Sequence, residues 1–239
     1  MRLVADMPNL GEGIIYYVVF LFSTTLHEAA HAWAAKVGGD LTAYHGGQVT
    51  LDPMPHIRRE PFGMVVLPLI GVALSGWPFG FASAPYDPNW AVRYPRRAGW
   101  MALAGPAANL LLVVLAGIAI NVGLLAGFFE APSSVSFGHV TRAVHGGFGN
   151  TIAFFVGALF SLNLVLFALN MLPFPPLDGS GALPLLLNDR AIPRYQSFIW
   201  SNAGLGWIGI IVAWQVFSYV FQPIFLIAVN LMYPGVGYG

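Results

Sequence analysis

Long apolar runs, separated by short polar stretches, dominate this chain. The runs cover residues 14–35, 62–81, 98–128, 150–171 and 204–232. A helix that crosses a bilayer needs about 20 predominantly apolar residues, so each run is long enough to be considered a membrane span. Prolines and glycines interrupt the second run, at Pro68, Gly71, Gly76 and Pro78. That run is therefore either a full span or a re-entrant segment.

The stretches between the runs carry weaker signals. Residues 42–51 contain threonine, tyrosine and valine around Gly46-Gly47, a pattern that predicts a short β-hairpin after the first helix. Residues 129–149 are polar and contain glycine, which indicates a loop. Residues 183–200 are mixed in character and are expected at the membrane interface.

Composition supports the membrane assignment. Hydrophobic residues make up 57% of the 239 positions and charged residues only 8%, whereas soluble domains carry roughly 25% charged residues. We expect an all-α polytopic protein with four to six transmembrane helices, embedded in the lipid bilayer. Residues 1–239 would form one domain, with a core over 14–182 and C-terminal helices over 183–239. Zero net charge without a basic patch argues against a nucleic-acid partner, and zero cysteines exclude disulfides and thiolate metal sites.

The basic residues favour the re-entrant interpretation. If 62–81 does not cross, eight of the ten basic residues fall on one side, namely Lys36, Arg58, Arg59, Arg93, Arg96, Arg97, Arg190 and Arg194. Cytoplasmic loops collect such residues, so the N-terminus is expected outside. Arg2 and the sequence Ala32-Trp33-Ala34 resemble a signal peptide, but Asp6 and Glu12 argue against cleavage. Small size suggests the cell membrane of a prokaryote.

The first apolar run contains the pattern His27-Glu28-Ala29-Ala30-His31. Histidines at i and i+4 project from one helical face and can bind one ion, while the intervening glutamate is left free to act as a base. Composition alone gives this pattern a chance occurrence of roughly two in a thousand. Ionisable groups inside a membrane are costly unless they are paired, and a Zn²⁺ ion would compensate them. The alternative is a polar contact between helices.

Catalytic zinc commonly has three protein ligands, so a third is needed. Asp178 is the first charged residue after Arg142, and prolines that break the helix precede it at Pro173, Pro175 and Pro176. Irregular backbone at membrane depth is tolerated where it is buried in protein or lines a watery cavity, which suits a hydrolytic site. Asp178 could instead cap the helix that follows. A glutamate ligand, Glu60 or Glu130, is another alternative.

Several motifs together resemble the site-2 protease family of intramembrane zinc metalloproteases, in its compact form. They are the His27 to His31 pattern, Leu103-Ala-Gly105-Pro106-x-x-Asn109, the stretch from Asn170 to Gly179, and Gln48-Val49-Thr50-Leu51-Asp52-Pro53 followed by His56. The resemblance covers most of the chain and implies that Asp178 is the third zinc ligand and that Asn170 lies near the substrate. Ser180 and Asp52 depart from the family pattern, in which glycine and asparagine are usual. We expect the compact form, without the soluble PDZ and CBS additions of other family members.

The expected function is zinc-dependent endoproteolysis of transmembrane protein substrates, with one Zn²⁺ per chain and the site towards the cytoplasmic side. Glu28 would act as general base on the attacking water. Gly47, Gln48, Val49 and Thr50 would pair with an extended substrate as an added β-strand. Asn170 would bind substrate backbone or cap its own helix. The alternatives are an inactive scaffold of the same fold and an ion transporter, and regulatory membrane partners stay open.

Other residues have supporting roles. Gly105 and Pro106 are expected to start the third span and to allow close packing against the histidine helix. Asn109 is expected to bond across helices near the site. The remaining histidines, His45, His56, His139 and His145, are expected to be solvated in loops.

Overall fold

The computed structural model describes residues 10–202 and 204–239. Its elements are α1 (Leu10–Gly38), α2 (Thr42–His45), α3 (Pro53–Arg59), a π-helical turn η1 (Phe62–Val66), α4 (Leu67–Ser75), α5 (Pro88–Arg93), α6 (Pro95–Leu125), β1 (Phe129–Glu130), β2 (Arg142–Ala143), α7 (Phe148–Asn170), α8 (Asp178–Ala182), a 3₁₀ turn η2 (Leu183–Leu185), α9 (Ala191–Ser201) and α10 (Leu205–Met232). Arg2 and Asp6, on which the signal-peptide question partly rests, lie outside the described residues.

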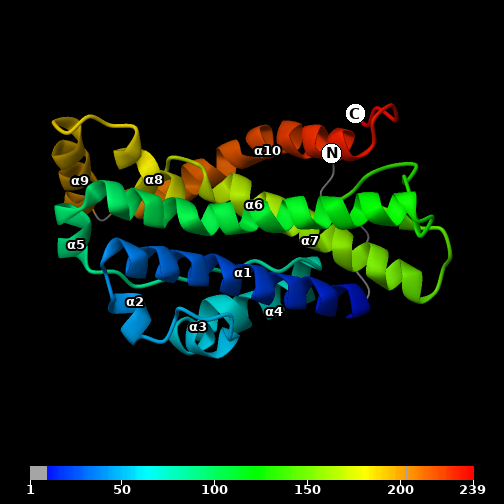
Figure 1. Cartoon of the computed structure of the whole chain (residues 1–239), viewed down its shortest axis with the longest axis horizontal. Helices are drawn as coiled ribbons and strands as arrows, with labels where there is room; N and C mark the ends of the chain where they lie inside the picture. The colour runs from blue at the N-terminus through cyan, green and yellow to red at the C-terminus, as the bar shows by residue number, and fades with distance from the viewer. Residues whose placement is uncertain (1–9, 203) are drawn as a thin grey trace.

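Four of the described helices, α1, α6, α7 and α10, are long and apolar enough to cross a membrane. They run side by side along the long axis of the molecule, and the short helices α2, α5 and α9 lie towards one end (Figure 1). Buried residues of α6, α7 and α10 form one apolar cluster, which includes Ile120, Phe160 and Phe225. The predicted all-α polytopic architecture is therefore confirmed.

The second apolar run folds back on itself. Its helical part, Phe62–Ser75, is shorter than a span requires. The backbone N–H of Phe81 donates to the carbonyl of Gly63 at 3.2 Å, so the end of the run lies beside its beginning. A Cβ on Gly63 would overlap the Phe81 carbonyl, and a Cβ on Gly80 would overlap that of Gly63. Glycine at both positions permits this close return of the chain.

The β-hairpin predicted over 42–51 is wrong. The stretch forms the single turn α2 and then an irregular segment, while the two-stranded antiparallel sheet of the structure pairs Phe129 with Ala143 and Glu130 with Arg142. Asp40 starts a helical turn because it accepts hydrogen bonds from the backbone and side chain of Thr42. Gly47, with φ of +72°, reverses the chain, and the N–H of Gln48 turns back onto Ala43. Local helical bonds therefore replaced strand pairing.

Two further expectations need correction. Pro106 does not start a span: α6 begins at Pro95, in the favoured first-turn position, and Pro106 lies buried inside the helix. The helix extends upstream because the N–H of Ala98 donates to the Tyr94 carbonyl. His56 is not solvated but 1% exposed, since α3 buries it and its Nε2 lies 3.1 Å from the Thr50 carbonyl oxygen. His45, His139 and His145 are exposed, as expected.

Asp40 fastens the turn after α1 to the segment before α5. Its Oδ1 accepts from the N–H and hydroxyl of Thr42 at 2.9 and 2.6 Å, and its Oδ2 accepts from the N–H of Asp87 at 2.8 Å. Burial raises the pKa of the Asp40 carboxyl, but these hydrogen bonds outweigh burial and hold that pKa below its usual 3.8. The carboxylate form is therefore the one that the fold stabilises.

Replacing Asp40 by alanine is expected to lower the free energy of unfolding by about 2 kcal/mol or more, because three donors lose a charged acceptor. Since the folded pKa is depressed, the stabilisation is present above about pH 4 and is lost as pH falls through the folded pKa. Thermal unfolding of the wild-type chain and of the Asp40→Ala variant, in detergent at neutral and at acidic pH, checks this. Asp189→Ala is the control, because its ion pair with Arg96 is exposed. Equal losses in the two variants would contradict the prediction.

Candidate metal centre

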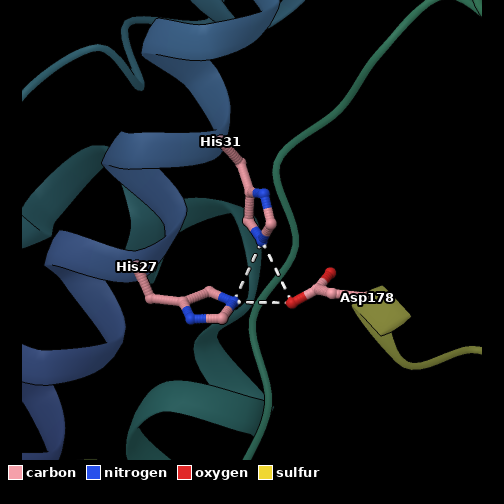
Figure 2. Close-up of side chains that lie close together, drawn as sticks. All are labelled: His27, His31 and Asp178. Carbon is pink, nitrogen blue, oxygen red and sulfur yellow. Dashed lines mark hydrogen bonds and ion pairs between the residues drawn. The ribbon is translucent and has the colours of Figure 1, made fainter. Parts of the chain in front are cut away.

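Three side chains from two distant parts of the chain converge inside the helical bundle. His27 and His31 lie one turn apart on α1, and Asp178 is the first residue of α8. The Nε2 atoms of the two histidines are 3.0 Å apart. Oδ2 of Asp178 lies 3.0 Å from Nε2 of His27 and 3.3 Å from Nε2 of His31. Figure 2 shows the three atoms forming a small triangle.

This triangle fits a zinc ion. Tetrahedral Zn²⁺ with bonds of about 2.0–2.1 Å places its ligand atoms about 3.3 Å from one another. Two imidazole nitrogens and one carboxylate oxygen are a common catalytic donor set, and it leaves the fourth position open. Oδ2 of Asp178 is buried and has no hydrogen-bond partner among the described residues, as expected of an atom whose partner is a cation.

The far nitrogen of each histidine is held by the protein. Nδ1 of His27 lies 2.6 Å from Oδ1 of Asn109, and Nδ1 of His31 lies 2.7 Å from the carbonyl oxygen of Met101. Both partners belong to α6. A histidine that donates from Nδ1 keeps the lone pair of Nε2 for a metal, so α6 presents both rings in a form that can bind one.

The approach to Asp178 is shaped by its neighbours. Three prolines precede it, and the Pro175–Pro176 peptide bond is cis. Gly179 is the next residue, and it lies so close to the end of α7 that a Cβ there would overlap the carbonyls of Met171 and Leu172. Asp178 is not the N-cap of α8, because Leu177 holds that position and no side chain caps the helix. Its carboxylate is thus left to face the histidines.

Glu28 is 5% exposed, and none of the hydrogen bonds or ion pairs of the described residues involves it. A carboxylate without a partner beside two histidines is available for proton transfer. The two glutamates that are alternative candidates for the third ligand bond to other residues. Glu60 accepts from the Ser83 hydroxyl at 2.7 Å, and Glu130 pairs with Arg142 at 2.6 Å.

Gly105 lies against the two histidine rings. A Cβ at this position would be 2.5 Å from Nε2 of His27 and would also overlap Nε2 of His31. Glycine here lets α6 approach α1 closely enough for Asn109 and Met101 to reach the rings. Pro106 follows, buried in the same face.

The residues proposed to bind substrate are not brought to the metal triangle by any contact of the described residues. Gln48 is buried, and its Nε2 donates to the Ser83 carbonyl at 3.4 Å. The N–H groups of Val49 and Thr50 donate to no described residue. Asn170 ends α7, and its side chain caps nothing within the described part of the chain.

Asn163 was missed by the sequence analysis. It lies in the C-terminal half of α7, is fully buried, and accepts a hydrogen bond from Asn109 at 2.9 Å. The available signal was an amide inside an otherwise apolar run, which is costly in a membrane unless it is bonded. The run contains other polar residues, so the signal did not single out this one.

An apolar groove of about 810 Å³ lies outside the metal centre. Its lining includes Trp33 and Val37 of α1 and Trp100, Leu103 and Leu110 of α6. At 100° per residue, these α6 positions lie on the opposite face of the helix from Gly105. None of the three proposed metal ligands lines the groove.

Sequence comparisons give relatives whose names agree with one another. "Putative zinc metalloprotease YwhC" of Bacillus subtilis is 32% identical over 210 residues, which cover 86% of this chain and 83% of that protein. "Putative zinc metalloprotease Rip2" of Mycolicibacterium smegmatis is 33% identical over 187 residues, and the protein of that name in Mycobacterium tuberculosis is 33% identical over 181. These matches cover 78% and 75% of this chain, but only 62% and 60% of the Rip2 proteins. No family model and no solved structure matches the sequence.

Proposed function

Because this chain belongs to the site-2 protease family of zinc metalloproteases, we propose that it is an intramembrane endopeptidase. It hydrolyses peptide bonds in or near transmembrane segments of other proteins. The observation that carries the proposal is the meeting of His27, His31 and Asp178 beside an unpartnered Glu28, within a bundle of membrane-length helices.

Each side chain has a defined role. His27, His31 and Asp178 hold the metal, with Asn109 and the Met101 carbonyl orienting the rings. When bound, zinc acts as a Lewis acid towards the scissile carbonyl and lowers the pKa of water. Glu28 takes a proton from the attacking water and passes it to the leaving nitrogen, so no covalent intermediate with the protein forms.

The substrate must be locally unwound, because helical carbonyls are hydrogen-bonded and shielded. The N–H groups of Val49 and Thr50 have no partner in the described chain and are free to pair with an extended peptide. The Asn170 side chain is likewise free to bond substrate backbone. Gly47 and Gln48 belong to the same segment, which is not a β-strand before substrate binds.

The distribution of charge supports the proposed orientation. Lys36 lies in the last turn of α1, beyond His31, and Arg96 and Arg97 lie in the first turn of α6, where Arg97 donates to the Gly38 carbonyl. Since basic residues collect in cytoplasmic loops, the metal centre lies towards the cytoplasmic face of a prokaryotic cell membrane. A substrate whose scissile bond lies near that face is the appropriate choice for an assay.

Cleavage of a single-span protein by the purified, detergent-solubilised chain tests the proposal. We expect about one zinc per chain, cleavage within or beside the span, loss of cleavage with a zinc chelator, and recovery when zinc is restored. Two measurements separate the alternatives: the cleavage assay with bound zinc recorded, and an ion-flux assay with the chain reconstituted in vesicles. An inactive scaffold of this fold would bind zinc and the substrate without cutting a panel of single-span proteins, and a transporter would move ions in vesicles and cut nothing. Absence of zinc from the wild-type chain would overturn the proposal.

A further inference from the structure

One run of hydrogen bonds joins α1, α6 and α7 and ends on His27. Nδ2 of Asn163 donates to the Leu159 carbonyl at 2.8 Å and to the Ser23 hydroxyl at 2.9 Å. Nδ2 of Asn109 donates to Oδ1 of Asn163 at 2.9 Å. Oδ1 of Asn109 lies 2.6 Å from Nδ1 of His27.

These bonds lie deep in the protein. Ser23, Asn109 and Asn163 are each 0% exposed, so solvent does not compete for their polar atoms. Each amide therefore depends on its neighbours for partners, because a buried polar group left without one is costly. Such dependence makes the orientation of one amide determine that of the next.

The direction of the run is set by a backbone group. A carbonyl oxygen only accepts hydrogen bonds, so the Leu159 carbonyl draws the NH₂ of Asn163 towards it and turns the Asn163 oxygen to Asn109. Asn109 must then offer its own NH₂ to that oxygen, which turns its oxygen to His27. An amide oxygen facing Nδ1 requires that Nδ1 carry the proton, and Nε2 of His27 is left with its lone pair.

We propose that Asn163 is a positioning residue that fixes the metal-binding tautomer of His27 through Asn109. It acts two hydrogen bonds away from the metal centre and contacts no proposed ligand. The inference rests on the proposed role of His27 as a zinc ligand. His31 needs no such relay, because its Nδ1 lies against the Met101 carbonyl, which can only accept.

Replacing Asn163 by leucine removes the oxygen that orients Asn109. The Asn109 amide can then turn its NH₂ to Nδ1 of His27, which favours the tautomer protonated at Nε2. We expect zinc affinity to fall about 10- to 100-fold, as for other changes behind a metal ligand. Competition with a chromophoric chelator measures the affinity of the full-length protein, and thermal unfolding of the metal-free form checks its fold. If the leucine variant does not fold, Asn163→Ala removes the same oxygen without adding bulk.

A second background separates orientation from packing. Asp at position 109 presents oxygen to His27 whichever way it turns, and carboxylates commonly fill this role behind zinc-bound histidines. In an Asn109→Asp background, Asn163→Leu is therefore expected to change zinc affinity by less than about threefold. Ser161→Ala is the matched control on α7, since its buried hydroxyl has no hydrogen-bond partner within the described chain and lies outside the run.

The outcomes are distinct. Unchanged zinc affinity in Asn163→Leu, or an equal loss in both backgrounds, overturns the positioning role and leaves the proposed protease function untouched. A loss confined to the Asn109 background supports the role even if no substrate is cut, because the readout is metal affinity. Wild-type protein that cuts nothing would instead count against the proposed function alone.

Discussion

A Glu28→Gln variant is expected to bind one zinc per chain and to cleave a membrane-embedded substrate roughly 10²- to 10⁴-fold more slowly than wild type. Glutamine has nearly the same size and shape as glutamate but cannot accept the proton of the attacking water. Glu28 is buried, and no hydrogen bond or ion pair of the described residues involves it, so its replacement by an amide of the same shape breaks none. The metal triangle contains no atom of Glu28 and is expected to persist.

Zinc content and cleavage rate, measured on the same preparations, check this result. Glu60→Gln is the matched control, because Glu60 lies in a loop where it accepts from Ser83, and the variant is expected to keep both properties. Loss of zinc from Glu28→Gln would assign Glu28 a ligand role. Undiminished cleavage would remove it as the general base.

The sequence predicts those features that depend on neighbouring residues. Four long helices follow from apolar runs of membrane length, and the pairing of His27 with His31 follows from helical spacing alone. Asp178 could be proposed because it stands alone as a charge after broken helix. Its distance from the histidines could not be predicted, since that distance depends on how α8 packs against α6 and α1.

The failures also have physical causes. Residues 42–51 carry strand-forming side chains, but Asp40 captures Thr42 and starts a helical turn instead. Pro106 reads as a helix start, yet α6 already has Pro95 in that position. Asn163 reads as one polar residue among several until its partners on two other helices are known. Each case depends on a bond that periodicity does not encode.

A Gly105→Ala variant is expected to lose zinc although no ligand is removed. Alanine is the better helix former, by about 1 kcal/mol, so the change alone would favour α6. Its Cβ, however, would stand 2.5 Å from Nε2 of His27 and would overlap Nε2 of His31, which is the space where the metal is expected. The rings cannot easily retreat, because their Nδ1 atoms are held by Asn109 and Met101. Zinc affinity should fall at least about 100-fold, the upper range for changes behind a ligand, and cleavage should fall with it.

Gly117→Ala on the same helix is the matched control. A Cβ there meets only Met232 and Phe160, at 3.9 and 4.0 Å, which is ordinary contact. This variant should keep zinc affinity and cleavage, and its metal-free form should unfold at the same temperature as wild type or higher. If Gly105→Ala binds zinc as tightly as Gly117→Ala, the two Nε2 atoms do not share one ion in this arrangement. If it loses zinc while the metal-free fold is intact, the absence of a side chain at Gly105 is itself a requirement of the metal centre.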